Sequence, residues 1–510
     1  MMKYYLAIDI GTTNWKATVF DEIGRLQAIE RTPTKTHTDQ SGNHFYVAEE
    51  IWNDVQLLCK KVTAKVGQPI SAVSVTSFGE AVVAVDKDGN TLGDIVAWFD
   101  TRSMKQAQQM KEHFGEERLY EITGLDVNPI FSLPKILWMR DNKPEIYDKA
   151  FKWLQMTDYI LFCLTGEFVT DYTLASRTLA LDILQNQWSM EILQGVGVPR
   201  EMLPCIEESG TVIGKISADI EKKTGITQGA KVAVGGNDHS CGSIAAGVIH
   251  GDKIFDSSGT AESFIYISKK NAVPKMKFAG QRTCRYLQKD RYALWGGIIS
   301  SGRSFDWAYE MFTSSKCFGI GQEHYSYDKV LDQVMDEQGM ESGLIFYPHL
   351  RGAGAPYWNP KISGSFLGLR DVHSAKNMMR SVLEGLSMQA RMIVEMEQSL
   401  AGVDVQSLCV VGGSSRNSQW QTIKASVTKK DIEICPEAEA TALGTAMLAA
   451  IGDGMYRDIE QASDMLATHN TVIHPNEEMA KRYDQLYELY CEGYKHLKKF
   501  NEQIYEVTRK

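Results

Sequence analysis

Short β-branched segments alternate with turn signals and a helical pattern in the first hundred residues, and this alternation limits the fold more than any other feature. The segments predict strands at residues 6–10, 17–20, 27–31, 72–76 and 82–85. Residues 49–66 carry apolar side chains at helical spacing, at Ile51, Val55, Leu58 and Val62. That spacing predicts a helix that crosses over the sheet. The pattern is typical of an α/β fold with a mixed sheet.

A second series of predicted strands follows a mostly helical middle. The middle covers about residues 103–220, with helices expected at 133–139, 146–164 and 190–196. Strands are then predicted at 231–234, 253–256, 264–267 and 408–411. From Pro475 onward the sequence is typical of a charged amphipathic helix.

The length of 510 residues is too great for one hydrophobic core and indicates two to four domains at roughly 100 to 200 residues each. Two large domains are the starting hypothesis, with a boundary near residues 247–251. We therefore predict an N-terminal domain of residues 1–248 and a C-terminal domain of residues 249–510 that ends in helices.

Composition excludes several classes of protein. The content of 43% hydrophobic and 23% charged residues is close to the globular average. A formal net charge of -10 opposes attraction to phosphate backbones and anionic lipid, so we expect neither nucleic acid nor a membrane as a partner. Nine cysteines without a Cys-x-x-Cys pair are typical of reduced thiols. Because Asp9 also interrupts the N-terminal apolar stretch too early for a signal peptide, we expect a cytoplasmic protein.

The first predicted hairpin carries polar groups that suit a phosphate. A strand ends in Asp9 and turns through residues 11–14 (GTTN), which offer backbone N–H groups, hydroxyls and one carboxylate. Lys16 would point to the same face as Asn14 and neutralise a γ-phosphate. A plain β-hairpin with a polar turn is the alternative. The sequence has neither a P-loop pattern nor a protein-kinase catalytic loop, so phosphate binding would use another scaffold.

Asp238 follows a predicted strand and a Gly-Gly pair. A carboxylate at this position can take up the proton of a hydroxyl while the hydroxyl oxygen is phosphorylated. The alternative is a helix N-cap, because Asp before residues 240–246 (SCGSIAA) suits that position equally well.

Two longer segments resemble a known family. Residues 364–369 (GSFLGL) and, after seven more residues, 377–384 (NMMRSVLE) fit at every position the second signature of the FGGY family, whose members include glycerol kinase, xylulokinase and L-fuculokinase. Residues 130–142 fit the first signature except at Ile130. Glycerol kinases have there a Tyr that touches the substrate, so this departure argues against glycerol. The resemblance runs from Tyr5 to about Ile451 and implies two actin-like (ribonuclease H-like) domains with ATP and sugar in the cleft between them.

The resemblance also assigns nucleotide contacts. By matching motif, the residues expected to bind ATP are Gly11, Thr12, Thr13, Asn14, Lys16, Gly259, Thr260, Gly302, Gly413 and Asn417. Asp9 would hold Mg²⁺ through water. Gly302 matches a glycine that permits close approach of the nucleotide, and Asn417 lies in the adenosine loop. Residues 439–444 are expected to pack as a helix near that pocket, without a catalytic role.

A second set of residues is expected to contact the sugar: Gly79, Glu80, Asp100, Arg102, Ile130, Asp238 and His239. Asp238 falls on the catalytic base of the family, which favours that role over the N-cap. Glu80 matches a polar residue that hydrogen-bonds substrate hydroxyls. Asp100 and Arg102 match a Trp-x-Asp-x-Arg element, in which they either contact the sugar or form a structural ion pair.

The sequence thus predicts an ATP- and Mg²⁺-dependent kinase that phosphorylates a hydroxyl of a small sugar or polyol by direct in-line transfer. The acidic Glu80 and Asp238 favour a ketose or sugar alcohol over an anionic aldonate. The alternatives are an actin-like nucleotide-binding switch and a catalytically inactive sugar sensor. Family habit favours a homodimer.

Overall fold

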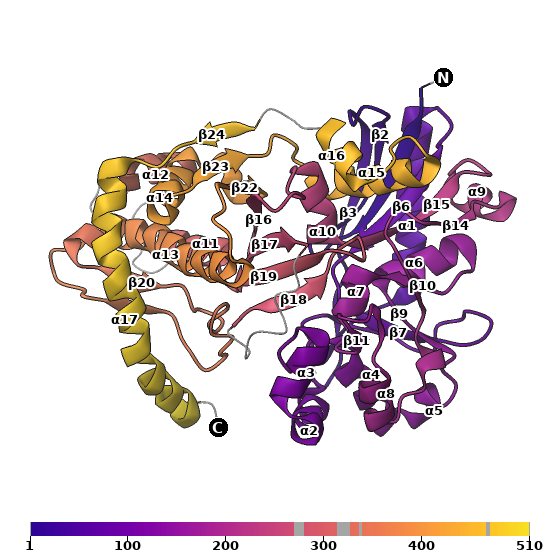
Figure 1. The fold of residues 1–510 in the computed structure, drawn as a ribbon, viewed down its shortest axis with the longest axis horizontal. Coiled ribbons are helices and arrows are strands. Elements are labelled where there is room, and N and C mark those ends of the chain that lie inside the picture. Colours follow the sequence, from indigo (N-terminus) through magenta and orange to yellow (C-terminus); the bar gives the residue numbers. More distant parts are fainter. Residues whose placement is uncertain (1, 270–279, 314–326, 336–338, 466–469, 509–510) are drawn as a thin grey trace.

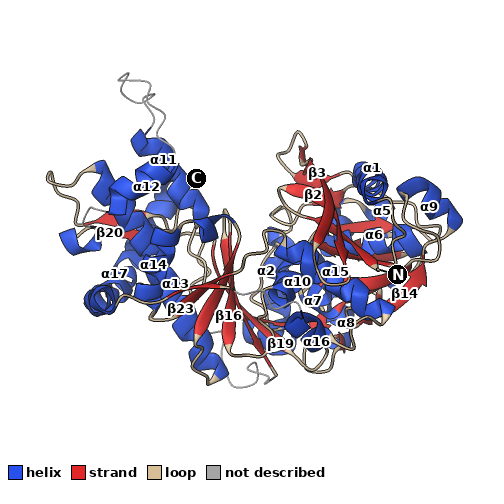
Figure 2. Cartoon of the chain, turned by 90° about the horizontal axis from the view of Figure 1, so that it is seen from above, coloured by secondary structure: helices blue, strands red, loops and turns tan. Residues whose placement is uncertain are grey.

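Two large sheets lie side by side, each covered by helices (Figures 1 and 2). The structure is a computed structural model, and it describes residues 2–269, 280–313, 327–335, 339–465 and 470–508. The N-terminal half, coloured indigo to magenta in Figure 1, contains a six-stranded sheet, and a seven-stranded sheet belongs to the C-terminal half. The expected α/β class is confirmed.

The first sheet is mixed, as predicted, but the strand predicted at residues 82–85 does not belong to it. Its strands in spatial order are β14 (Val212–Lys215), β15 (Lys231–Asn237), β6 (Ala72–Ser77), β1 (Tyr4–Ile10), β2 (Asn14–Asp21) and β3 (Leu26–Pro33). β1 runs antiparallel to β2 and parallel to β6, and β6 runs parallel to β15. The register pairs Ile10 with Ser77 and Ser77 with Asn237, so these three parallel strands end at the same edge. The predicted helix α1 (Ala48–Val66) packs against β2 and β3.

The second sheet repeats this plan. Its strands are β18 (Arg282–Arg285), β19 (Tyr292–Ile298), β17 (Glu262–Ser268), β16 (Lys253–Ser258), β22 (Ser407–Val411), β23 (Asp431–Ile434) and β24 (Thr471–Ile473). β16, β22 and β23 are parallel, and Ser257 pairs with Val411. The loops that follow β16 and β22 therefore lie side by side. A separate two-stranded pair joins β20 (Ile345–Tyr347) and β21 (Ser365–Leu367).

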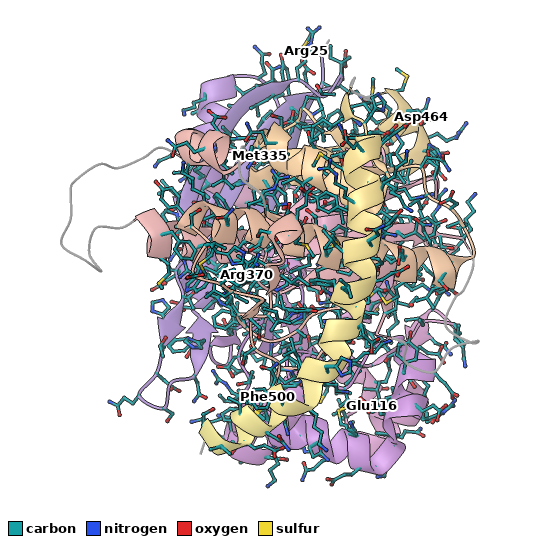
Figure 3. The ribbon with its side chains drawn as sticks, turned by 90° about the vertical axis from the view of Figure 1, so that its left-hand side faces the viewer. Arg25, Glu116, Met335, Arg370, Asp464 and Phe500 are labelled. Atoms are coloured by element: carbon teal, nitrogen blue, oxygen red, sulfur yellow. The ribbon has the colours of Figure 1, made fainter. Side chains whose placement is uncertain are left out.

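Long helices surround the second sheet. They are α11 (Gly302–Thr313), α12 (Tyr327–Met335), α13 (Ala375–Ala401), α14 (Ser418–Thr428) and α17 (Glu477–Thr508). α17 is the charged helix expected after Pro475, and it runs along the face of this half, with Phe500 near its end (Figure 3).

The N-terminal half also contains a five-stranded sheet and many short elements. The sheet contains β4 (His37–Thr38), β5 (His44–Tyr46), β8 (Ile95–Val96), β7 (Val82–Val85) and β9 (Lys152–Gln155). The helices are α2 (Met104–Phe114), α3 (Glu116–Thr123), α4 (Ser132–Asn142), α5 (Pro144–Tyr147), α6 (Met156–Thr165), α7 (Tyr172–Ser176), α8 (Met190–Val196) and α9 (Ala218–Thr224). Two small pairs are β10 (Val169–Asp171) with β13 (Cys205–Glu207) and β11 (Leu181–Asp182) with β12 (Gln187–Trp188).

One predicted helix, residues 146–164, is wrong in its centre. β9 separates α5 from α6 and pairs with β7. Trp153 and Leu154, on opposite faces of β9, are both buried. A short apolar run of this kind is compatible with a buried strand as well as with a helix. It forms a strand here because it pairs with the edge of β7.

Helices α10 (Asp238–Ala245) and α15 (Ala440–Asp453) pack together, and α15 also packs against β1, β6 and β15 of the first sheet. An ideal Cβ on Gly444 would lie 1.8 Å from the carbonyl oxygen of Cys241, so this close contact requires glycine. The predicted domain division after residue 248 falls just beyond α10 and stays a prediction. α16 (Ile459–Met465) completes this region. Within the described ranges, no helix is both long and apolar enough to cross a membrane.

Candidate active site

Three parallel strands of the first sheet end beside one another, and each leads into predicted site residues. β1 leads to the turn at residues 11–14, β6 leads to Gly79 and Glu80, and β15 leads to Asp238. Ligands of open α/β sheets bind at the carboxyl ends of parallel strands. The register therefore brings three separate predicted elements to one edge.

The turn between β1 and β2 is tight and polar. The Gly11 N–H donates to the Asn14 carbonyl at 3.1 Å. A Cβ on Gly11 would lie 2.9 Å from that oxygen, so the turn favours glycine. Thr12 and Thr13 are exposed at its tip. The phosphate-binding and the plain-hairpin interpretations both require such a turn, so the phosphate-binding role of residues 11–14 stays a prediction.

Asp9 lies directly below this turn and is buried, with no hydrogen-bond partner for its Oδ1. Burial raises the pKa of Asp9 to about 7, the charge of Lys16 opposes this, and Asp238 and Glu439 add to it. Lys16 Nζ is 3.9 Å from Asp9 Oδ2 and 2.7 Å from Glu439 Oε2. Glu439 follows β23 of the second sheet, so the predicted phosphate lysine is held between the two halves. No sequence pattern indicated this partner.

These groups fit Mg²⁺. A buried carboxylate with one unpaired oxygen beside a hydroxyl-rich turn supplies oxygen ligands, and Mg²⁺ is usually bound by one or two carboxylates together with waters and phosphates. Among the residues that the structure describes, no group of three or more His, Cys, Asp or Glu is placed to hold a metal. The Mg²⁺ site at Asp9 stays a prediction.

Asp238 is the first residue of α10, and the N-cap of that helix is Asn237. The Asn237 side chain accepts from the His239 N–H at 3.2 Å, and Asp238 Oδ1 accepts from the same group at 2.8 Å. The N-cap position considered for Asp238 thus belongs to its neighbour. Asp238 remains half-buried at the sheet edge and close enough to Asp9 to raise the pKa of that residue.

Glu80 forms a buried ion pair that sequence reasoning missed. Arg177 Nε donates to Glu80 Oε1 at 2.5 Å, and Arg177 Nη2 contacts the same oxygen. Burial lowers the pKa of Arg177, but the charges and hydrogen bonds of Glu80 and Cys284 together raise it more, so the pKa is raised overall. Gly79 makes room for the arginine, since a Cβ there would lie 3.1 Å from Arg177 Cβ.

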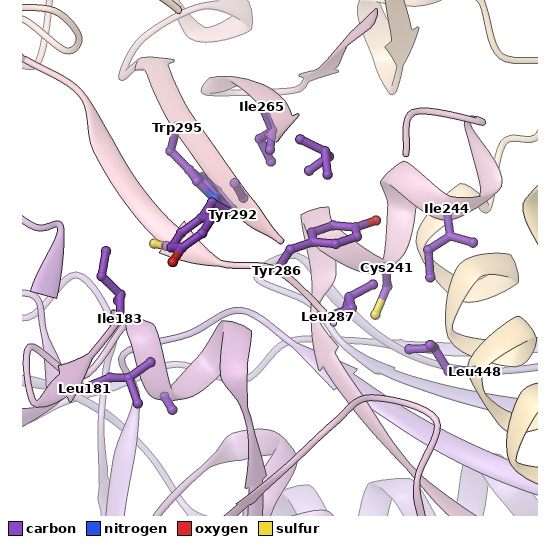
Figure 4. Close-up of a cluster of buried hydrophobic side chains, with 14 of the residues drawn as sticks. Leu181, Ile183, Cys241, Ile244, Ile265, Tyr286, Leu287, Tyr292, Trp295 and Leu448 are labelled. Carbon is purple, nitrogen blue, oxygen red and sulfur yellow. The ribbon is translucent and has the colours of Figure 1, made fainter. Parts of the chain in front are cut away.

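An aromatic ring connects this pair to His239, the neighbour of Asp238. The Arg177 guanidinium lies 5.1 Å from the Trp295 ring centre, and the His239 ring stands edge-on to Trp295 at 5.3 Å. Trp295 comes from β19 of the second sheet and belongs to the same buried cluster as Tyr286 and Cys241 (Figure 4). Residues from both halves therefore surround the predicted sugar site.

A second buried ion pair supports this site from below. Arg282 on β18 donates to both carboxylate oxygens of Asp126, at 2.5 and 3.0 Å. Its guanidinium also lies 3.8 Å from the Trp358 ring centre and 5.3 Å from that of Phe131. Phe131 follows the half-buried Ile130, the residue that departs from the family pattern.

Asp100 and Arg102 form the structural ion pair that was one of their two predicted roles. Arg102 donates to both Asp100 oxygens, at 2.8 and 2.9 Å. The pair also binds the backbone of His44, whose N–H donates to Asp100 and whose carbonyl accepts from Arg102. The Arg102 guanidinium lies 5.1 Å from the Trp138 ring centre. A sugar contact by these residues stays a prediction.

A cavity of about 710 Å³ lies in the C-terminal half. Its lining includes five predicted ATP contacts: Gly259, Thr260, Gly302, Gly413 and Asn417. A Cβ on Gly302 would lie 2.5 Å from the Gly259 carbonyl oxygen, whereas a Cβ on Gly413 would meet nothing within 4 Å. The side chain of Asn417 caps α14 by accepting from the Trp420 N–H at 3.0 Å. Lining residues that the sequence did not indicate include Phe305, Asp306, Leu331 and Asp332.

A buried charge triad lies behind the second Gly-Thr loop. Lys424 Nζ is 2.7 Å from Asp256 and 2.5 Å from Glu262, and all three side chains are at most 1% exposed. Ser301 donates to Glu262 at 2.5 Å. Because Asp256 lies on β16 and Ser301 precedes Gly302, the triad fixes the two backbone segments that meet at Gly302 and Gly259.

Comparison with known proteins decides the family. The model of the N-terminal domain of FGGY carbohydrate kinases matches residues 4–245, and the model of the C-terminal domain matches residues 256–452. The chain belongs to the FGGY family of carbohydrate kinases. The resemblance predicted from the two signatures is confirmed.

Relatives with different names are similar to this FGGY kinase to the same degree. Xylulose kinase of Bacillus subtilis is 27% identical over 98% of both chains, and gluconokinase of the same organism is 27% identical over 95% of this chain and 94% of its own. Among solved structures, gluconate kinase from Lactobacillus acidophilus superimposes with a TM-score of 0.90 at 26% identity, covering 98% of both chains. The two-domain, actin-like sugar kinase fold is confirmed, and enzymatic kinases rather than inactive sensors are the relatives.

Proposed function

We propose that this carbohydrate kinase transfers the γ-phosphoryl group of ATP to a hydroxyl of a small uncharged sugar, a ketose or a sugar alcohol. The observation that carries the proposal is the position of Asp238. Its carboxylate lies at the edge where β1, β6 and β15 end, with Asp9 on one side and His239, next to the Trp295 ring, on the other. In-line transfer requires a base near both the acceptor hydroxyl and the phosphate.

The sugar would lie against Trp295 with its hydroxyls toward the Glu80–Arg177 pair. Glu80 accepts hydrogen bonds from hydroxyls and Arg177 donates them, so the pair recognises an uncharged polyol in one orientation. As the acceptor oxygen forms its bond to the γ-phosphorus, its proton passes to Asp238 and ADP leaves with the bridging oxygen. Residues from both halves exclude water, which would otherwise compete as acceptor.

The nucleotide would span both halves. Its adenosine part fits the cavity at Gly413 and Asn417, and its phosphates run past Gly259, Thr260 and Gly302 toward the turn at residues 11–14. Lys16 contributes to phosphate binding once its ammonium shifts from Glu439, with which it is paired at 2.7 Å. Asp9 would hold Mg²⁺ through water, and Mg²⁺ there would neutralise phosphate charge.

Charge favours an uncharged substrate over an aldonate. Arg102, Arg177 and Arg282, the arginines placed near the sugar site above, are each paired with a buried carboxylate, namely Asp100, Glu80 and Asp126. A substrate carboxylate would have to displace one of these partners, and it would also meet Asp238. Names of relatives do not decide the matter, because xylulose kinase and gluconokinase of Bacillus subtilis are equally similar at 27% identity.

The test is ADP release from the purified protein with Mg²⁺-ATP across ketoses that include D-xylulose, sugar alcohols that include glycerol, and aldonates that include gluconate. Phosphorus NMR of the product identifies the phosphorylated hydroxyl. We expect strong turnover with one ketose or sugar alcohol. Gluconate as the best acceptor would contradict the substrate class, and bound ATP with no acceptor would favour a switch or sensor. The homodimer and the cytoplasmic location stay predictions, the first testable by light scattering.

A further inference from the structure

Lys135 on α4 places a buried ammonium group among backbone carbonyls. Its side chain is 0% exposed. Its Nζ donates to the carbonyls of Ala97 at 2.9 Å, Trp98 at 3.0 Å and Glu80 at 3.2 Å. A protonated lysine has three N–H donors, so each carbonyl receives one. One side chain thus joins the loop that carries Glu80 to the segment that leads to Asp100.

The backbone of Glu80 needs this support. Its φ is 69°, a left-handed conformation that few residues other than glycine adopt. Its N–H donates to Gln155 Oε1 at 2.9 Å, and its carbonyl accepts from Lys135 and from Ser132 Oγ at 3.3 Å. Such conformations persist only where the surroundings over-determine them. These bonds aim the Glu80 carboxylate at Arg177.

The protonation of Lys135 changes near neutrality. Burial lowers the pKa of Lys135 to about 7, while Glu80 and Asp100 raise it and Arg102 lowers it further. A neutral amine has two N–H donors and a lone pair, so it cannot serve three carbonyls. The longest of the three bonds, to Glu80, is the one expected to be lost.

We propose that Lys135 is a positioning residue that clamps the Glu80 loop for sugar binding, and that losing one proton loosens the clamp. The inference rests on the proposed function, because Glu80 matters here as a sugar ligand. The Lys135 ammonium is fully buried and donates to three backbone carbonyls, which leaves it no N–H group for a sugar or nucleotide. It acts through the carbonyl of Glu80 and through the segment that ends in the Asp100–Arg102 ion pair.

Stability and sugar binding should respond to pH in opposite directions. Below pH 7 the lysine is protonated in both the folded and the unfolded chain. Between about 7 and 10.5 the unfolded chain keeps the proton that the folded chain has lost. Because the unfolded state then binds more protons, the contribution of Lys135 to stability rises with pH in this window. If Lys135 had only a structural role, sugar binding would change in the same direction as stability. If Lys135 is a clamp, sugar binding weakens while stability rises.

The kinetic test compares the KM for the sugar from pH 6.5 to 9.0 in the wild type, Lys135→Met and Lys152→Met. D-xylulose is the probe unless the acceptor panel identifies a better substrate. Lys152 is the matched control, because its Nζ also donates to backbone carbonyls, those of Glu201 and Leu203. As pH rises from 6.5 to 9.0, we expect the KM for the sugar to rise about three- to tenfold in the wild type and in Lys152→Met, which corresponds to the loss of one hydrogen bond. The KM for ATP should change equally in all variants. Lys135→Met should have a high KM that does not vary with pH. A flat wild-type profile, or a wild-type profile in Lys135→Met, would overturn the proposal.

A second readout needs no sugar. Hydrogen exchange of the peptide containing Glu80, corrected for intrinsic rates, should show protection lost between pH 6.5 and 8.5 in the wild type and absent at both pH values in Lys135→Met. If that variant does not fold, Ser132→Ala replaces it, since it removes the other donor to the Glu80 carbonyl and should make the pH effect on exchange larger. Unchanged protection across this range would refute the clamp even if the protein proves not to be a sugar kinase.

Discussion

Replacing Arg177 by Met would leave Glu80 as a buried carboxylate without its cation. The two side chains are only 12% and 6% exposed, so water replaces little of the lost interaction. Removing one partner of a buried pair costs about 3–5 kcal/mol, and we expect about 3 kcal/mol because the sugar site admits some water. The exposed pair of Arg118 and Glu191, 49% and 47% exposed, provides the control. Arg118→Met should cost at most about 1 kcal/mol.

Urea unfolding of the wild type, Arg177→Met, Glu80→Gln and the double variant measures the pair directly. The free energy of the first unfolding transition is compared among the four proteins, because chains with several domains unfold in more than one step. The double variant should be more stable than Arg177→Met alone, since the amide that replaces the Glu80 carboxylate carries no charge, with a coupling energy of about 2 kcal/mol. The KM for the sugar should rise in both single variants. Equal costs for Arg177→Met and Arg118→Met, or no coupling, would refute the reasoning.

Four further substitutions test other parts of the structure. Gly302→Ala, with its Cβ 2.5 Å from the Gly259 oxygen, should lower both Tm and ATP affinity, whereas Gly413→Ala, at an open position, should lower only ATP affinity in calorimetry. Lys424→Met should cost about 3–5 kcal/mol in urea unfolding, because two carboxylates stay buried without a cation. Burial lowers the pKa of His349 from 6.5 to about 4, so as pH falls through this window the unfolded chain takes up a proton that the folded chain does not, and stability falls. The free energy of unfolding should fall between pH 7 and pH 4.5 by about 2–3 kcal/mol less in His349→Phe than in the wild type.

Regular elements with a clear period were predictable from the sequence. α1 and the strands β1, β2, β3, β6, β15, β16, β17 and β22 appear where apolar spacing placed them, because one face of each must be buried, whereas β14, β18, β19, β23 and β24 were not predicted. Residues 146–164 were not predictable in the same way. β9 exists because β7 offers a free edge, and that edge comes from a distant, earlier part of the chain.

The candidate site likewise contains residues that local sequence motifs predict and residues that they do not. The local motifs around Asp9, Glu80 and Asp238 could be recognised because each is a short contiguous segment. Arg177 could not, since it meets Glu80 across 97 residues and only the fold joins them. Glu439, which meets Lys16 across 423 residues, is a similar case. The fold brings the charged partners of buried groups together from distant parts of the chain, so no spacing in the sequence predicts these pairs.

The turnover number of Asp238→Asn at saturating Mg²⁺-ATP and saturating sugar tests the central claim most directly. The substitution keeps the shape of the side chain and removes its ability to take up the hydroxyl proton. We predict a kcat at least about 100-fold below that of the wild type, with Tm and the Kd for ATP unchanged, while the surface control Asp219→Asn retains full activity. A kcat for Asp238→Asn within about threefold of the wild type would contradict the account.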